Sequence, residues 1–314
     1  MIKLKELLIE NKLYGIHHNK DLDGMCSGAI LKYKYPNIKL IPFDYGYPMP
    51  KSIEPNSSVI MVDVSMPMPM MKKLADGVNG NLIWIDHHQS ANNEYKNYEK
   101  IDMEVVYDDS IAACEILWKY LFPNKEIPLS VKLIGMYDTW RDNDKDYWNN
   151  YILPFQYGMR EYNKVVRYAY DISKFPFKIF DSEEEIQNII EKGKEVLFIV
   201  DKQNDEILKN SFPMKYLGYN ALCVKLENNQ GFQSNLVSKI ENNFDVLIVI
   251  QKLKLGNWKF HFRSRKPNVD CSKLAKYIDV AGGEHKGAAG AETKDLNKFI
   301  KLVPKEYITK IKSI

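Results

Sequence analysis

Short apolar runs alternate with helix-like segments through the first half of the chain. The runs that predict strands are four to six residues long: Leu13–His18, Ile38–Phe43, Val59–Val64 and Leu82–Ile85. The segments with helical character are Gly24–Tyr33, Met68–Asp76, Ser110–Leu121 and Leu129–Met136. Strands that are apolar along their whole length are buried on both faces, so this alternation predicts an open, mostly parallel sheet flanked by helices.

The second half has a different order of elements. Residues 141–181 are rich in Tyr, Asn, Asp and Lys and predict an irregular, partly helical elaboration. Acidic residues at 181–185 are typical of a helix N-terminus, and the residues after them predict a long helix over 182–212. The strands and helices predicted beyond it indicate a smaller α/β domain: Ala221–Leu226, Val246–Gln251, Trp258–Phe262, Cys271–Tyr277 and Leu296–Lys301. We therefore expect an α/β protein with an N-terminal domain at 1–181, a helical linker at 182–214 and a C-terminal domain at 215–314.

Composition narrows the class of protein. A chain of 314 residues is long for a single core, and a net charge of +3 does not by itself indicate a polyanionic partner. Its four cysteines lie far apart without a CxxC pair, which argues against a disulfide framework or a structural zinc site. We find no signal-type stretch and no run near the roughly 18 apolar residues of a membrane helix, so we expect a cytoplasmic protein.

Acidic and histidine residues gather where the predicted strands end. Residues 17–24 read HHNKDLDG, Asp63 lies at the end of the third run, and residues 86–88 read DHH after the fourth. The segments 17–24 and 86–88 hold four of the six histidines in the chain. Because parallel strands end at one edge of a sheet, these side chains should meet there. Carboxylates with histidines suit manganese, and also magnesium or zinc, in a metal pair that activates water for attack on phosphorus.

Four stretches agree in order and spacing with a known group of motifs: HxxxDxDG at 17–24, VDVS at 62–65, DHH at 86–88 and YDTW at 137–140. They resemble the DHH phosphoesterase superfamily, whose members include RecJ-type nucleases, nanoRNases, cyclic-dinucleotide phosphodiesterases and family II inorganic pyrophosphatases. The resemblance implies that the N-terminal domain is catalytic and holds two divalent metal ions, with Mn²⁺ favoured and Mg²⁺ as the alternative.

The resemblance also implies a role for each matching residue. The implied metal ligands are His17 and Asp21 for the first ion, Asp23, His87 and Asp138 for the second, and Asp63 as the carboxylate that bridges them. His88 would contact the phosphate or act as an acid toward the leaving oxygen. Asp86 would orient the two DHH histidines from behind.

Two adjacent histidines compete for the first position of the motif. Successive side chains of a strand point to opposite faces, so only one of His17 and His18 readily faces the metals. The His-x-x-x-Asp-x-Asp spacing of the family selects His17. A shift of one residue stays open, because some relatives carry a shorter loop, and His18 then remains as a residue that contacts substrate or points elsewhere.

Residues 281–290 read AGGEHKGAAG and resemble the GGGHxxAAG signature of the domain that accompanies many DHH catalytic domains. By that resemblance, Gly282, Gly283 and His285 would bind the substrate phosphate or a terminal nucleotide. The small residues from Ala288 onward would open a tightly packed helix. Glu284 departs from the family pattern, which usually has a third glycine at this position.

Arg263 and Ser264 resemble the Arg-Ser element of the same domain, at the end of the strand Trp258–Phe262. An arginine there is a good bidentate partner for phosphate. The surrounding segment, residues 251–276, holds eight Lys or Arg residues against one acid. We therefore expect the C-terminal domain to bind substrate through Arg263, Ser264 and the glycine-rich loop.

A chain of two domains with a cleft between them favours a short substrate. We expect exonucleolytic hydrolysis of short oligonucleotides to mononucleotides, as in the nanoRNase branch. The alternatives are a cyclic-nucleotide or linear-dinucleotide phosphodiesterase and a nucleoside bisphosphate phosphatase; a RecJ-like single-strand exonuclease and a non-catalytic nucleotide sensor rank below them. The sequence leaves open the preference among RNA, DNA and cyclic nucleotides, the cleavage polarity, the native metal, the role of 141–181 and the oligomeric state, a homodimer included.

Overall fold

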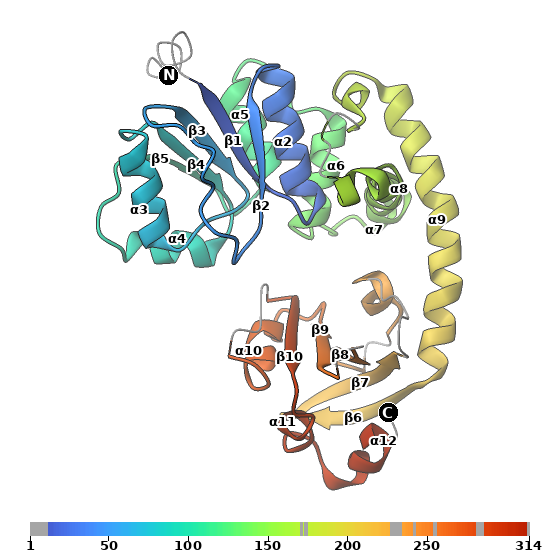
Figure 1. Cartoon of the computed structure of the whole chain (residues 1–314). Coiled ribbons are helices and arrows are strands. Elements are labelled where there is room, and N and C mark those ends of the chain that lie inside the picture. The colour runs from blue at the N-terminus through green and yellow to red at the C-terminus, as the bar shows by residue number, and fades with distance from the viewer. Residues whose placement is uncertain are drawn as a thin grey trace. The chain divides into compact units, whose positions relative to one another are not determined.

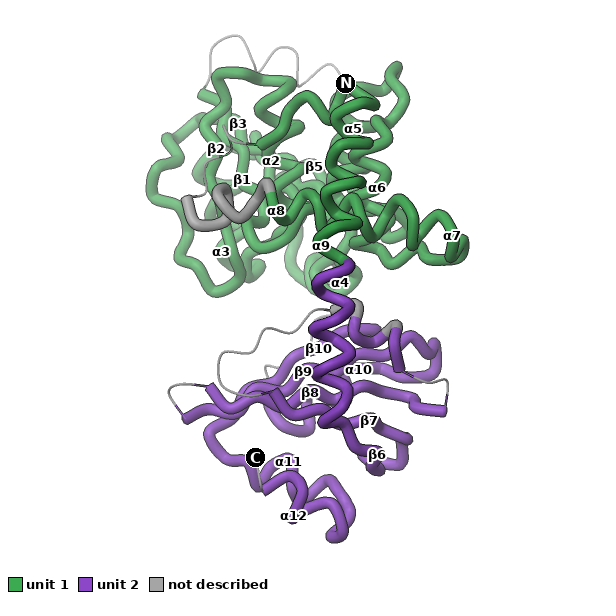
Figure 2. Tube along the Cα trace, turned by 90° about the vertical axis from the view of Figure 1, so that its right-hand side faces the viewer, with its two compact units in different colours: residues 1–197 green, residues 198–314 purple. Residues whose placement is uncertain are grey.

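The structure is a computed structural model that describes residues 12–169, 172, 175–226, 234–240, 243–253, 256–280 and 286–312. The chain divides into two compact units, residues 1–197 and 198–314, and the division falls inside the long helix α9 (Glu183–Lys209) (Figure 2). Each unit is built on its own five-stranded sheet. The predicted α/β class is therefore confirmed. The boundaries predicted at 181 and 214 lie on either side of α9.

A parallel sheet in the order β2-β1-β3-β4-β5 forms the centre of the first unit (Figure 1). Its strands are β1 (Leu13–His18), β2 (Lys39–Phe43), β3 (Ser58–Val62), β4 (Leu82–Asp86) and β5 (Glu104–Tyr107). The order reverses between β1 and β3, because the chain adds β2 on one side of β1 and the later strands on the other. A reversal of this kind opens a crevice at the carboxyl ends of the two strands, where ligands of such sheets bind.

Helices cover both faces of this sheet and extend beyond it. In chain order they are α2 (Leu22–Lys34), α3 (Met68–Gly77), α4 (Gln89–Lys96), α5 (Ala113–Leu121), α6 (Leu129–Asp138), α7 (Lys145–Tyr147), the π-helical turn η1 (Trp148–Ile152), α8 (Leu153–Ala169) and the 3₁₀ turn η3 (Phe177–Phe180). The segment 141–181, predicted to be irregular and partly helical, contains a helix of 17 residues, α8. The short elements β5 and α4 were not predicted, and β5 is only four residues long and half-buried.

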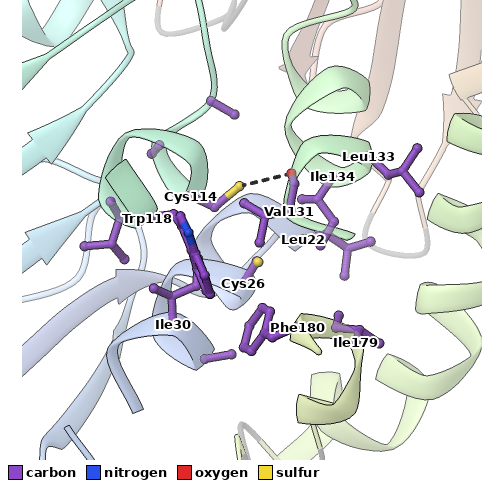
Figure 3. Close-up of a cluster of buried hydrophobic side chains, with 14 of the residues drawn as sticks. Leu22, Cys26, Ile30, Cys114, Trp118, Val131, Leu133, Ile134, Ile179 and Phe180 are labelled. Atoms are coloured by element: carbon purple, nitrogen blue, oxygen red, sulfur yellow. Dashed lines mark hydrogen bonds between the residues drawn. The ribbon is translucent and has the colours of Figure 1, made fainter. Parts of the chain in front are cut away.

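Strand alternation divides the core of this unit into two layers. Ile60 and Val62 of β3 face α2 and α5, whereas Val59 and Met61 face α3. On the α2 side, Cys26 and Ile30 of α2 pack with Cys114 and Trp118 of α5, and Val131 of α6 joins them (Figure 3). The Cys114 thiol donates to the Val131 carbonyl at 3.9 Å. This core holds α2, α5 and α6 together, and all three helices contribute groups to the site described below.

The second unit is a mixed sheet in the order β10-β9-β8-β7-β6, in which only β7 and β8 run parallel. Its elements are β6 (Ser211–Tyr216), β7 (Tyr219–Leu226), the 3₁₀ turn η4 (Ser234–Lys239), β8 (Val246–Lys252), β9 (Trp258–Arg263), α10 (Cys271–Lys276), β10 (Ala288–Thr293), α11 (Asn297–Ile300), the 3₁₀ turn η5 (Lys305–Tyr307) and α12 (Ile308–Lys312). None of the helices in the described ranges is long and apolar enough to cross a membrane.

The helix predicted to open at Ala288 is wrong, because this segment forms the edge strand β10. Ala289, Ala291 and Thr293 are buried, whereas the intervening residues are more exposed, which is the period of two typical of a strand. Ala289 and Ala291 pair with Phe262 and Phe260 of β9. Small side chains fit beside these large buried rings, so here tertiary packing overrides the helix propensity of alanine.

Candidate metal centre

The turn from β1 into α2 places the first carboxylate. Asp21 caps α2: its Oδ1 accepts a hydrogen bond from the Gly24 backbone N–H at 2.9 Å, and its Oδ2 lies 2.8 Å from His18 Nδ1. A Cβ atom at Gly24 would lie 2.4 Å from the His18 carbonyl oxygen. The chain therefore needs glycine at this position to turn so tightly beside the histidine.

The structure places His18, and not the predicted His17, among the carboxylates. His17 faces α2, where a Cβ atom at Gly28 would lie 2.9 Å from its ring, and its Nδ1 lies 2.9 Å from the His18 carbonyl oxygen. His18 continues the opposite face of β1, the face of Tyr14 and Ile16. Strand alternation does separate the two histidines, as expected, but it turns the second one toward the site.

Asp63 lies between two histidines, directly after β3. Its Oδ2 is 3.7 Å from His18 Nδ1, and its Oδ1 is 3.4 Å from His87 Nε2. The residue is 1% exposed, and Oδ2 accepts no hydrogen bond from the residues that the structure describes. Its backbone has a left-handed φ of 61°, a conformation that costs about 1–3 kcal/mol and is concentrated at functional sites. Each carboxylate oxygen therefore faces a different histidine.

His87 is surrounded by three carboxylates. Its Nε2 lies 3.6 Å from Asp23 Oδ2, 3.4 Å from Asp63 Oδ1 and 3.4 Å from Asp138 Oδ2. These separations exceed a normal hydrogen bond and suit groups that converge on one cation. Asp23 is fixed by the N-terminal end of α5, because its two oxygens accept the backbone N–H groups of residue 113 at 2.9 Å and residue 114 at 2.7 Å.

Asp86 holds the DHH histidines from the end of β4. Its Oδ1 accepts the backbone N–H of His87 at 2.8 Å and that of His88 at 3.2 Å, and it lies 2.7 Å from His88 Nδ1. Burial alone lowers the pKa of His88, but the hydrogen bond and the charge of Asp86 outweigh it and raise that pKa to about 9. Asp86 thus fixes the ring orientation of His88 and favours its protonated form.

The buried carboxylates are crowded enough to hinder their own ionisation. Loss of solvation raises the pKa of the buried Asp63 and that of the more exposed Asp138 well above the usual range, and the charges of Asp23 and Asp21 raise both further. The side chains that can share an ion form three overlapping groups: His18, Asp21 and Asp63; Asp23, His87 and Asp138; and Asp63, Asp86, His87 and His88. Divalent cations would relieve this repulsion, so the residues present fit a centre for two metal ions bridged by Asp63.

Two further groups at the site were not selected from the sequence. Asp44 follows β2, and its Oδ1 lies 3.5 Å from His18 Nε2 while its Oδ2 lies 3.3 Å from Lys20 Nζ. Its place directly after a strand is the same signal that identified Asp63 and Asp86. Glu115 is buried in the first turn of α5 and forms an ion pair with Arg141.

The predicted substrate-binding residues Arg263 and Ser264 of the second unit donate hydrogen bonds to backbone carbonyls of the same unit. Arg263 Nη1 donates to the Phe262 carbonyl at 2.8 Å and to the Ala289 carbonyl at 3.1 Å. Ser264 Oγ donates to the Asp245 carbonyl at 2.6 Å. The predicted phosphate-binding residues Gly282, Gly283 and His285 lie outside the described residues.

Comparison with known proteins agrees with this arrangement. Residues 14–137 match the DHH family, N-terminal domain. This match shows that the first unit contains a DHH-family N-terminal domain. The DHH match contains every predicted ligand of the first unit except Asp138, which follows its last residue. A curated relative, the uncharacterized protein R106 of Acanthamoeba polyphaga mimivirus, is 23% identical over 243 residues. That alignment covers 75% of this DHH chain, which spans about half (53%) of the relative's length.

Solved structures share the fold of this DHH protein at low identity. A pGpG-specific phosphodiesterase of Vibrio cholerae matches with a TM-score of 0.53 at 12% identity, over 96% of this chain and 97% of that one. An exopolyphosphatase-related protein of Bacteroides fragilis matches with 0.55 at 15%, over 99% and 97%. RecJ of Thermus thermophilus, in complex with Mn²⁺, matches with 0.55 at 14%, over 96% of this chain and 52% of that one.

Proposed function

We propose that this DHH protein is a metal-dependent phosphoesterase that hydrolyses short oligonucleotides to mononucleotides. The observation that carries the proposal is Asp63, whose two oxygens face His18 and His87 from the centre of a buried cluster of carboxylates. A carboxylate in this position is suited to hold two cations at the short separation of about 3.5–4 Å that two-metal hydrolases use.

The ligand set indicates the kind of metal. On one side of Asp63 the donors are His18 and Asp21, and on the other they are Asp23, His87 and Asp138. Oxygen donors with imidazole suit Mn²⁺, and also Mg²⁺, better than soft metals. When bound, such cations would activate water at neutral pH and offset negative charge on the phosphoryl group. Our assignment replaces the predicted His17 with His18 and keeps the other ligands.

The protein's own residues would position the substrate and move a proton. Since Asp86 occupies Nδ1 of His88, the opposite nitrogen, Nε2, is the one that would act on substrate. The hydrogen bond to Asp86 raises the pKa of His88, which favours a ring that can donate to a phosphoryl oxygen or to the leaving oxygen. In the second unit, Arg263 is proposed to pair with a substrate phosphate together with the residues of the glycine-rich loop.

Two observations favour nucleotides as substrates, and one of them, the likeness to a pGpG-specific phosphodiesterase, favours short ones. Members of this superfamily act on phosphoesters, and among proteins of the same fold one is a pGpG-specific phosphodiesterase and another is the exonuclease RecJ. Cyclic dinucleotides, nucleoside bisphosphates and longer single strands are the competing substrates. A nucleotide sensor without turnover is the competing class of protein.

A substrate panel with two variants tests the proposal. We expect the full chain, loaded with Mn²⁺ and containing two metal ions by elemental analysis, to hydrolyse two-mers faster than twenty-mers. Asp63→Asn should abolish turnover and lower the metal content, and His88→Ala should lower kcat by about 10²–10⁴-fold with both ions retained. Asp76→Asn, at an exposed acid of α3 paired with Lys72, is the control and should change neither quantity.

The outcomes separate the competing functions. Faster cleavage of twenty-mers would indicate a RecJ-like exonuclease, and binding of nucleotides with metal but without turnover would indicate a sensor. Undiminished turnover in both Asp63→Asn and His88→Ala would refute the assigned site.

A further inference from the structure

Trp140 is an exposed aromatic residue two positions after Asp138, a proposed ligand of the candidate metal centre. It follows α6 by two positions, and α6 ends at the proposed ligand Asp138. Trp140 is 39% exposed, although it is costly to leave the large apolar side chain of a tryptophan in water. An exposed tryptophan so close in the sequence to a proposed ligand calls for an explanation.

The backbone does not explain a tryptophan here. Trp140 has a left-handed φ of 54°, and the chain around it forms a helix end in which its N–H donates to the Tyr137 carbonyl at 3.2 Å and the Arg141 N–H donates to the Met136 carbonyl at 2.9 Å. This pair of hydrogen bonds defines a Schellman motif, whose left-handed position favours glycine. A bulky side chain is unfavourable in this conformation, so the backbone at position 140 favours glycine over the tryptophan that occupies it.

Packing explains only one side of the ring. The ring centroid of Trp140 lies 5.2 Å from that of Trp148 and 6.1 Å from that of Tyr137. Trp148 is buried, and its ring stacks nearly parallel on that of Tyr137 with the centroids 5.7 Å apart. Arg160 lies over Tyr137 on a further side, and its guanidinium donates to the Tyr137 hydroxyl at 3.3 Å. The inner rings thus form a firm support, and Trp140 is the member of this aromatic cluster that remains open to solvent.

We propose that Trp140 is a stacking platform for a nucleobase of the substrate, beside the metal centre. This inference rests on the proposed function, and it adds that the site recognises the base as well as the phosphate. An exposed indole, supported from behind by Trp148 and held in a conformation better suited to glycine, is accounted for if a flat aromatic ligand packs on it. Stacking on an aromatic side chain is tolerant of base identity, so the platform would contribute affinity rather than sequence preference.

Trp140→Gly separates this role from a structural one, because glycine fits the helix end better. We expect the unfolding temperature of Trp140→Gly to stay equal or rise by a few degrees. Its KM for an adenine dinucleotide should rise by about 5–100-fold with kcat little changed, as expected for the loss of one stacked base. A matched dinucleotide that lacks both bases should be hydrolysed equally by the two proteins. Trp140→Phe should recover most of the affinity.

Tyr151→Ala provides the matched control. Tyr151 is 43% exposed and stacks on Tyr147 at 5.0 Å, so the substitution removes a comparably exposed aromatic ring from the same region. Its KM should equal that of the wild type. The stacking role would be refuted by an unchanged KM in Trp140→Gly, or by an equal rise in KM for the base-free dinucleotide.

Failure of the proposed function gives a different result. If the wild-type chain hydrolyses neither dinucleotide, the proposed hydrolysis of short oligonucleotides is refuted, and calorimetric titration with AMP and with ribose 5-phosphate still tests the stacking role. Tighter binding of AMP than of ribose 5-phosphate in the wild type, lost in Trp140→Gly, supports it. Equal AMP affinity in the two proteins overturns it.

Discussion

The two neighbouring histidines of β1 are expected to respond differently to truncation. His17→Ala should lower stability and leave metal binding intact, because the ring packs against α2 at Gly28 and is 5% exposed. His18→Ala should weaken metal binding, because Nδ1 of His18 lies 2.8 Å from Asp21 and 3.7 Å from Asp63. The pair of substitutions therefore tests which histidine belongs to the metal centre.

The expected magnitudes follow from these surroundings. Removing the buried ring of His17 opens a cavity and should cost about 2–4 kcal/mol, as other large-to-small substitutions in cores do. In a unit of 197 residues such as the first, this corresponds to a fall in Tm of roughly 5–10 °C. Removing the ring of His18 takes away a proposed direct ligand. The loss of affinity for the first ion should be at least the 10–100-fold seen when an outer-sphere partner is lost.

Elemental analysis and calorimetric titration with Mn²⁺, together with thermal unfolding without metal, measure both effects. His17→Leu is the matched control, since leucine refills the cavity but cannot bind a metal ion. It should restore much of the Tm and keep both ions. Loss of an ion in His17→Leu, together with two bound ions in His18→Ala, would refute our placement of the ligand.

Two further substitutions probe the support of the site. Gly24→Ala should displace the β1–α2 turn, because the new Cβ atom would lie 2.4 Å from the His18 carbonyl oxygen. We therefore expect calorimetric titration to show weaker Mn²⁺ binding, and an unchanged affinity would contradict this. Arg141→Met should destabilise the chain by about 3–5 kcal/mol at pH 7, because it leaves the buried carboxylate of Glu115 without its cation. Burial raises the pKa of Glu115, and the charge of Arg141 opposes that rise. Without Arg141, the folded Arg141→Met variant should therefore keep Glu115 protonated to a higher pH than the unfolded chain does. Its stability then falls as pH rises above about 4.5, and denaturant unfolding should show the deficit shrinking as pH is lowered toward that value; a deficit independent of pH would contradict the assignment.

Strand ends were the most informative signal in the sequence. The apolar runs at Leu13–His18 and Leu82–Ile85 predicted two strands of a parallel sheet, and the polar residues after them predicted a shared edge. The structure brings Asp21, Asp63 and Asp86 to that edge. This inference succeeded because it depends only on the direction of buried parallel strands, which hydrophobic pattern reveals.

Other features depended on contacts between segments distant in the chain. Ala288–Thr293 became a strand because it pairs with β9, although its composition favours a helix. Asp44 reaches the centre only because β2 lies next to β1. Local pattern does not encode such neighbours, so sequence reasoning overlooked them.

The sequence by itself determined the class of the fold, the resemblance to DHH phosphoesterases and most of the carboxylates and histidines that the structure brings together. Only the tertiary structure showed that His18, and not His17, lies among the carboxylates. Alternation along β1 separates the two rings, but the side of the sheet that α2 covers is set by packing between elements. The structure alone likewise revealed the left-handed backbone of Asp63 and Trp140, since residue type disfavours that conformation and only the surrounding hydrogen bonds and packing impose it.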